Sequence, residues 1–75
     1  MKLNEILKES FNATEAEMGD EVRLMSYVNW DSMAHMFFIT KLEEAYSIEL
    51  TGDEIADMQT VGDIKKVITN KGKVV

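Results

Sequence analysis

Apolar side chains recur at helical spacing in three separate parts of the chain. They repeat every three or four residues over 2–11, 32–47 and 61–70, which is the period of an α-helix with one buried face. The main apolar positions of these segments are Leu3, Ile6, Leu7 and Phe11; Phe38, Leu42 and Tyr46; and Val61, Ile64, Val67 and Ile68. No stretch alternates apolar and polar residues for long enough to predict a strand. The pattern therefore predicts an all-α fold with three main helices.

Capping residues mark where the later helices begin. Thr51 and Glu54 match the S/T-x-x-E capping box, in which the hydroxyl and the carboxylate each accept a hydrogen bond from a backbone N–H. They predict one short additional helix over 53–58. Thr60 is expected to cap the last helix.

A long connection, residues 12–30, joins the first two predicted helices and shows no regular period. Connections of this length are unusual in small domains and are often functional. The apolar residues expected to anchor it to the core are Leu24, Met25, Tyr27 and Val28. The prediction is a small bundle of three main helices plus one short helix, with a long loop between the first and second helices, in one domain over 1–75.

Composition narrows the class of protein. A chain of 75 residues has room for one small core, and without cysteine it forms neither disulfides nor thiolate metal sites. No segment reaches the roughly 20 apolar residues of a membrane span, and no basic-then-apolar leader is recognisable. We therefore expect a cytoplasmic protein without membrane insertion. The acids Asp53, Glu54 and Asp57 do not have the spacing of a calcium loop, so no metal is expected.

The formal net charge of −6 argues against nucleic acid as a partner, because phosphates repel such a surface. The acids are concentrated in the middle of the chain, where residues 31–57 hold seven acids and one base. This distribution favours basic partner proteins. A surface that is merely solubilising is the alternative.

Ser32 is the residue whose position carries the most chemical information. It follows Asp31, a good N-cap residue, and opens the strongest helix pattern. The first turn of a helix offers free N–H groups and the positive end of the dipole, which favour a phosphate. His35 lies three residues on, but no third group orients a Ser32–His35 pair, so a hydrolase is the least favoured interpretation. We expect Ser32 to be an attachment point, His35 to be structural and the chain to be no enzyme.

The second feature of this helix is the side that faces away from Phe38 and Leu42. It carries Met33, Met36 and Phe37, with Glu43 and Glu44 one to two turns further on. Clustered apolar side chains on a surface mark contact sites, and methionines adapt to several partners. We predict partner docking through Met36, Phe37, Glu43 and Glu44. The alternatives are a helix that is buried on two sides and acids that form a solvated face.

Several segments together resemble an acyl carrier protein. They are Asp31-Ser32-Met33, Leu42-Glu43-Glu44-Ala45-Tyr46, Ile48-Glu49-Leu50, Asp53-Glu54-Ile55 and Thr60-Val61-Gly62-Asp63-Ile64. The resemblance runs from about Val28 to Ile68. It implies that Ser32 carries a covalent 4′-phosphopantetheine arm, transferred from coenzyme A by a holo-acyl-carrier synthase, a phosphopantetheinyl transferase. It also implies acyl groups held as thioesters and partner enzymes that load and transfer them.

The departures from that family's pattern are also informative. Met33 stands in place of the usual leucine, and Asn29 occupies a common glycine position, where asparagine can adopt a left-handed backbone. Trp30 resembles the residue found in discrete, specialised carriers. Ala34 and Phe37 stand where fatty-acid carriers usually present acids. From these departures we infer a carrier in a specialised lipid, polyketide or surface-glycan pathway rather than primary fatty-acid synthesis. We also expect it to be a monomer.

Two questions stay open at the level of sequence. An unmodified helical adaptor that binds partners through Met33, Met36 and Phe37 is the alternative function. The cargo is not determined either, since fatty acyl, hydroxyacyl, polyketide and aminoacyl groups can all form the same thioester. Side chains predicted to face inward, and to shelter an acyl chain if one enters the bundle, are Phe38, Ile39, Leu42, Ile55 and Met58.

Overall fold

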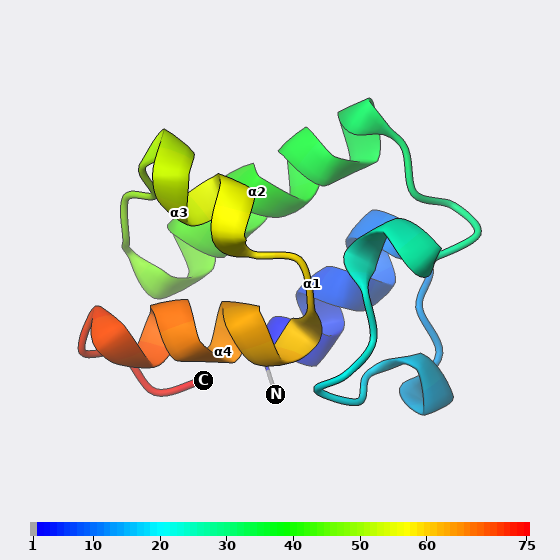
Figure 1. Ribbon diagram of the computed structural model, residues 1–75, viewed down its shortest axis with the longest axis horizontal. Coiled ribbons are helices and arrows are strands. Elements are labelled where there is room, and N and C mark those ends of the chain that lie inside the picture. The colour runs from blue at the N-terminus through cyan, green and yellow to red at the C-terminus, as the bar shows by residue number, and fades with distance from the viewer. Residues whose placement is uncertain (1) are drawn as a thin grey trace.

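Residues 2–75, which the computed structural model describes, form four α-helices and two short 3₁₀ helices (Figure 1). The elements are α1 (Lys2–Phe11), η1 (Glu15–Glu17), η2 (Leu24–Ser26), α2 (Ser32–Tyr46), α3 (Gly52–Asp57) and α4 (Val61–Asn70). Within these residues there is no strand, only an isolated antiparallel bridge between Arg23 and Thr60. The prediction of an all-α bundle with three main helices and one short helix is confirmed.

The helix boundaries agree closely with the sequence pattern. The first and last helices begin and end at the predicted residues. The second helix ends at Tyr46 rather than at residue 47, because Ser47 adopts a left-handed backbone with φ 53° and caps it. The third begins at Gly52, directly after its cap Thr51, and ends at Asp57, one residue before the predicted end.

The core lies between the helices, and α1 packs directly against α2. Its largest fully buried side chains are Phe11, Phe38, Leu3, Leu7, Leu24, Leu42, Ile64, Ile68 and Val61. The ring of Phe11 is central, with centroids 5.3 Å from Tyr27 and 5.4 Å from Phe38. Aromatic pairs at this separation stabilise a core beyond the area that they bury.

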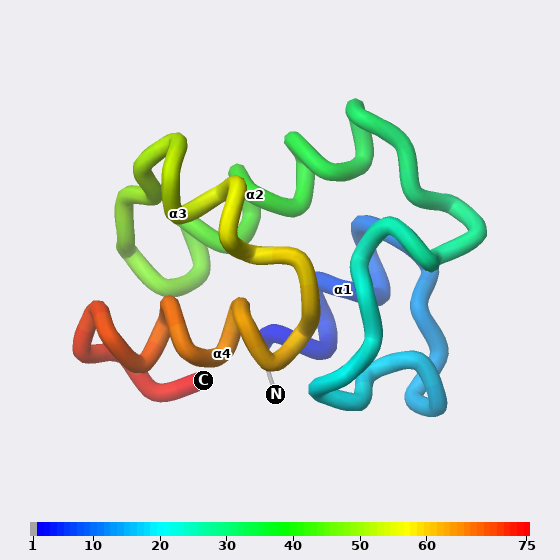
Figure 2. The backbone as a smooth tube through the Cα atoms, viewed as in Figure 1, coloured from blue at the N-terminus to red at the C-terminus, as the bar shows by residue number. Residues whose placement is uncertain are grey.

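The long loop before α2 is tied to the connection between α3 and α4, as Figure 2 shows. The N–H of Leu24 donates to the carbonyl of Gln59 at 3.0 Å, and the N–H of Gly62 donates to the carbonyl of Asp20 at 2.9 Å. A Cβ at Gly62 would lie only 3.1 Å from the Asp20 oxygen, so any larger residue would require this loop to shift by a few tenths of an ångström. The Lys65 ammonium adds an ion pair with Asp20 at 2.7 Å.

Only half of the predicted loop anchors are correct. Leu24 and Tyr27 are buried, and the Tyr27 hydroxyl donates to the carbonyl of Glu17 at 2.7 Å. Met25 and Val28 were predicted to be anchors as well, but their side chains are 71% and 93% exposed. The cause is the 3₁₀ helix η2, because three residues per turn put Leu24 and Tyr27 on one side and turn their following neighbours outward.

Both predicted caps of the later helices are confirmed. The Thr51 hydroxyl accepts from the N–H of Glu54 at 3.1 Å, and the Glu54 carboxylate accepts from the N–H of Thr51 at 3.0 Å. Thr60 and Asp63 form the same pair of bonds, both at 3.1 Å, at the start of α4. Of the four helices in residues 2–75, none is long and apolar enough to cross a membrane. Nor do three potential metal-binding side chains gather anywhere in this part of the chain.

Candidate functional site

Ser32 is the exposed first residue of α2, and the residue before it builds the helix start. Asp31 has an extended backbone, with φ −153° and ψ 176°, and is the N-cap. Its Oδ1 accepts from the N–H of Ala34 at 2.7 Å, and its carbonyl accepts from the N–H of His35 at 2.9 Å. The cap thus fixes the backbone that presents the Ser32 hydroxyl to solvent.

The electrostatics of this helix start suit a phosphate ester. Ala34 and His35 donate to Asp31, whereas the N–H groups of Ser32 and Met33 meet no acceptor among residues 2–75. Free N–H groups and the positive end of a helix dipole both stabilise an anion. The donors present at Ser32 therefore fit a negatively charged group attached to its oxygen.

His35 is paired with Trp30 and not with Ser32. The Trp30 Nε1–H donates to His35 Nδ1 at 3.4 Å, and the two rings lie 6.0 Å apart at 57°. His35 is half-buried, and burial lowers the pKa of its imidazole. An Nδ1 that accepts a hydrogen bond cannot carry a proton, so the imidazole is neutral in this arrangement. Among the described residues no hydrogen bond joins His35 to Ser32, so the nucleophilic pair is not assembled.

Asn29 does not take the left-handed backbone that asparagine can adopt. Among the non-glycine residues described, a positive φ occurs at Asn12 and Ser47. The Asn29 side-chain amide instead donates to the carbonyl of Phe11 at 3.3 Å. That carbonyl belongs to the last turn of α1, where backbone oxygens lack partners within the helix. Asn29 therefore fastens the end of the loop to α1.

The outward side of α2 is apolar near Ser32. Met33, Met36 and Phe37 are 84%, 58% and 45% exposed. The Lys41 ammonium lies 5.5 Å from the centroid of the Phe37 ring, within the range of a cation–π contact. Since these side chains reach solvent, α2 is not buried on two sides within this chain.

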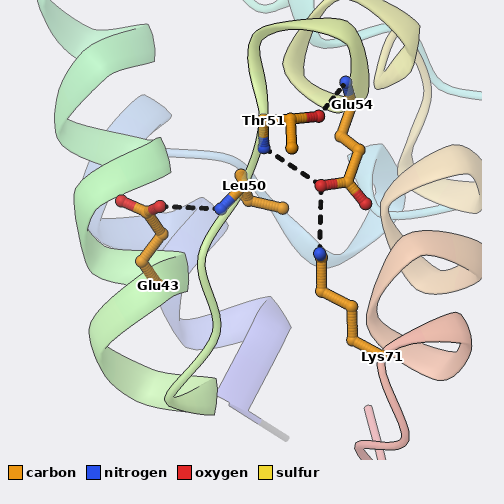
Figure 3. Close-up of polar contacts among 5 residues, drawn as sticks. All are labelled: Glu43, Leu50, Thr51, Glu54 and Lys71. Carbon is orange, nitrogen blue, oxygen red and sulfur yellow. Dashed lines mark hydrogen bonds and ion pairs between the residues drawn. The ribbon is translucent and has the colours of Figure 1, made fainter.

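The two adjacent acids near the end of α2 have different surroundings. Glu43 is half-buried, and its Oε2 accepts from the backbone N–H of Leu50 at 2.9 Å (Figure 3). Glu44 is exposed. Glu43 thus makes a contact within the chain, whereas the Glu44 carboxylate is free of such a contact among the described residues, and the docking role of both acids stays a prediction.

A pocket of about 300 Å³ lies beside the Trp30–His35 pair. It is lined by Arg23, Leu24, Met25, Trp30, His35, Ile55, Ala56, Met58 and Gln59. Of the five side chains predicted to face inward, four are buried, whereas Ile55 is half-buried and lines this pocket. Sequence reasoning did not find the pocket, because its walls come from two loops and two helices that have no common period.

Comparison with known proteins identifies the family. An acyl carrier protein of Wolinella succinogenes is 30% identical over 70 residues, which cover 92% of each chain. The acyl carrier protein MbtL of Mycolicibacterium paratuberculosis is 30% identical over 63 residues, which cover 84% of this chain and 71% of that protein. The chain belongs to the acyl carrier protein family. No protein-family model matches it.

The fold of this acyl carrier protein agrees with that of a solved relative. The solution structure of a holo acyl carrier protein from Geobacter metallireducens has a TM-score of 0.79 and 26% sequence identity. The match covers 93% of this chain and 84% of that one. The resemblance predicted from the sequence is therefore confirmed, and the role it gives the chain is that of an acyl carrier rather than a catalyst.

Proposed function

We propose that this acyl carrier protein holds its cargo on a 4′-phosphopantetheine arm attached to Ser32 and delivers it to partner enzymes. The observation that carries the proposal is the exposed Ser32 hydroxyl at the first position of α2, behind the Asp31 cap. When bound, the arm supplies a terminal thiol on which acyl groups are held as thioesters. The chain itself has no cysteine to compete for them.

The residues around Ser32 support an attached phosphodiester. The N–H groups of Ser32 and Met33 are available, and the helix dipole favours negative charge at this end. The Asp31 carboxylate accepts from the N–H of Ala34, which offsets part of its own charge beside the phosphodiester. This chain therefore binds and orients the arm through its backbone and leaves the reactions to other proteins.

Mass spectrometry of the intact protein tests the attachment. After incubation with coenzyme A and a broad-range phosphopantetheinyl transferase, the mass should rise by ~340 Da, the size of the arm. Ser32→Ala should not gain mass, whereas the control Ser26→Ala, at another exposed serine, should gain it as the wild type does. An unmodified wild type would favour the alternative function, a helical adaptor without a prosthetic group.

The same proposal extends to the pathway. Phe37 is half-exposed under the Lys41 ammonium, and Ala34 is the other position where the family resemblance leads one to expect an acid. Loss of two acids weakens docking to enzymes that recognise an acidic helix. We therefore assign the carrier to a specialised lipid, polyketide or surface-glycan pathway. Normal elongation rates with the holo protein as sole carrier of a reconstituted fatty-acid synthase would contradict this.

The proposed partners are the transferase that modifies Ser32 and the enzymes that load and remove the acyl group. We propose that the protein meets them as a monomer in the cytoplasm. Size-exclusion chromatography with light scattering, on the apo and holo forms at micromolar concentration, tests the monomeric state. A dimer mass for either form would contradict it.

A further inference from the structure

The pocket beside the Trp30–His35 pair differs in charge from the rest of the molecule. Its lining contains one cationic side chain, Arg23, and no acid, although the chain has a net charge of −6. Three other surface pockets within residues 2–75 are each lined by two or more acids. Arg23 forms no ion pair with any residue of this range. The pocket is therefore a place in an acidic protein where a negatively charged ligand meets a cation that no acid neutralises.

The polar side chains of this lining offer free donors, whereas their acceptors are already engaged. The Arg23 Nη1–H donates to Gln59 Oε1 at 3.2 Å, which leaves the other guanidinium N–H groups and the Gln59 amide NH₂. The Trp30 Nε1–H donates to His35 Nδ1, so the neutral imidazole keeps an N–H at Nε2. These remaining donors have no acceptor among residues 2–75. A carboxylate matches them, because both of its oxygens accept, whereas an ammonium group only donates.

The rest of the lining is apolar, and the volume limits the size of an occupant. Leu24 and Met58 are buried, and Ile55 is half-buried. At about 30 Å³ for each molecule of liquid water, the pocket of about 300 Å³ has room for about ten atoms other than hydrogen. A short acyl group with a carboxylate at its free end combines an apolar stem with a head that only accepts. A long hydrocarbon chain would exceed this volume and leave Arg23 without a partner.

The pocket lies beside the residue to which the arm is proposed to be attached. Trp30 precedes Ser32 by two residues, and His35 follows it on the first turn of α2. Side chains three residues apart on a helix have Cβ atoms about 5–6 Å from one another. The N–H groups of Ser32 and Met33 are available to a phosphodiester, so the donors of the pocket remain for the cargo.

We infer that this pocket binds a carboxylate at the free end of the acyl cargo, with Arg23 as its cationic partner and Gln59 and His35 as further donors. The inference rests on the proposed attachment at Ser32 and names the class of cargo, a short acyl group that ends in a carboxylate. An aminoacyl group does not fit, because its ammonium would meet Arg23 as a like charge and would find no free side-chain acceptor.

Cargoes that differ at the free end test this inference. The transferase loads the wild type from glutaryl- or pentanoyl-coenzyme A, which share one carbon chain and end in a carboxylate and a methyl group, or from β-alanyl-coenzyme A, which ends in an ammonium group. Intact mass verifies each product, and the apo and unacylated holo forms are the references. Nuclear magnetic resonance follows the Arg23 Nε–H, the Gln59 amide and the Trp30 indole N–H, and thermal unfolding gives Tm.

We expect the glutaryl form alone to shift the Arg23 and Gln59 signals and to raise Tm by about 2–4 °C above that of the holo form. Arg23→Gln should gain the arm but lose the rise in Tm. Lys73→Gln is the matched control, because it removes an exposed positive charge in the C-terminal segment, which Figure 1 shows far from the start of α2. This control should keep the rise. Circular dichroism verifies that both variants are folded.

Equal Arg23 and Gln59 signals in the glutaryl and pentanoyl forms would overturn the inference while Ser32 still gains the arm, and so would a rise in Tm that persists in Arg23→Gln. Arg23 signals that move on conversion of apo to holo protein, and no further with glutaryl, would show that the guanidinium binds the phosphodiester, which also overturns it. A wild type that gains no arm would instead refute the proposed attachment, and this inference with it.

Discussion

The Glu43 carboxylate joins the end of α2 to the segment that leads into α3, because its Oε2 accepts from the N–H of Leu50 at 2.9 Å. Thr51 follows at once and forms the capping box with Glu54, whose carboxylate also pairs with the Lys71 ammonium at 3.0 Å (Figure 3). These contacts link α2, α3 and the end of α4. Because α3 has no fully buried residue, polar contacts make a large contribution to its position.

Glu43→Ala should therefore destabilise the protein, whereas Glu44→Ala should not. Removing Glu43 leaves the half-buried N–H of Leu50 without its acceptor, which costs about 1 kcal/mol. In a domain of this size that lowers Tm by about 4–8 °C. Glu44→Ala is the matched control, because it makes the same change in charge and helix propensity one residue along, at an exposed position. Equal Tm values for the two variants would show that the Glu43 contact contributes nothing.

The Asp31 cap should be replaceable by asparagine but not by alanine. The Oδ1 of Asp31 accepts from the N–H of Ala34 at 2.7 Å, and an asparagine oxygen can do the same. We expect Asp31→Ala to lower the free energy of unfolding by about 1 kcal/mol and Asp31→Asn to change it by a few tenths. Urea unfolding measures both. If Asn were as destabilising as Ala, charge at this position and not the cap would support α2.

Stability should fall as the pH is lowered through the unfolded-state pKa of His35. Burial lowers the pKa of His35 in the folded protein, so below about pH 6.5, the ordinary histidine value, the unfolded chain binds more protons. The stabilisation is fully present above that pH and is lost as the pH falls toward the folded pKa. Protonation of Nδ1 also removes the acceptor for Trp30 Nε1–H. Arg23, another cation, lines the same pocket.

Thermal unfolding at pH 7.5 and pH 5.5 measures this effect, with His35→Gln as the control. Glutamine keeps an acceptor for Trp30 and does not titrate. The Tm of the wild type should fall further than that of the variant over this range, and Trp30 fluorescence should change only in the wild type. Identical pH profiles would show that the imidazole is not held neutral by the fold.

The helices and caps could be predicted because their causes are local. Periodic apolar residues, Thr51 before α3 and Thr60 before α4 lie within a few residues of the structures that they determine. The place of Ser32 at the first position of α2 also has a local cause, because its neighbour Asp31 is the N-cap. The exposure of Met25 and Val28 in the loop could not be predicted from the apolar pattern alone, because it depends on the 3₁₀ helix that turns these side chains outward.

What the sequence did not predict depends on contacts between distant segments. The hydrogen bond from the Leu50 N–H to Glu43 forms only when the chain reverses after α2. Of the two adjacent acids, Glu43 therefore makes a contact within the chain that the sequence does not reveal. The pocket beside Trp30 forms where the loop meets α3. The partner of Asn29 is a carbonyl 18 residues away, and no local pattern marks it. In each case packing of the whole chain determined which side chains remain available to a partner.

A variant with Ser32 as its sole serine tests the central claim most directly. Ser10→Ala removes a buried hydroxyl that has no partner among the described residues, Ser26→Ala removes one local bond, and Ser47→Gly suits the left-handed backbone there. With coenzyme A and the transferase, this triple variant should gain ~340 Da, and adding Ser32→Ala should abolish the gain. An unmodified triple variant beside a modified wild type, or a gain that survives Ser32→Ala, would contradict attachment at Ser32.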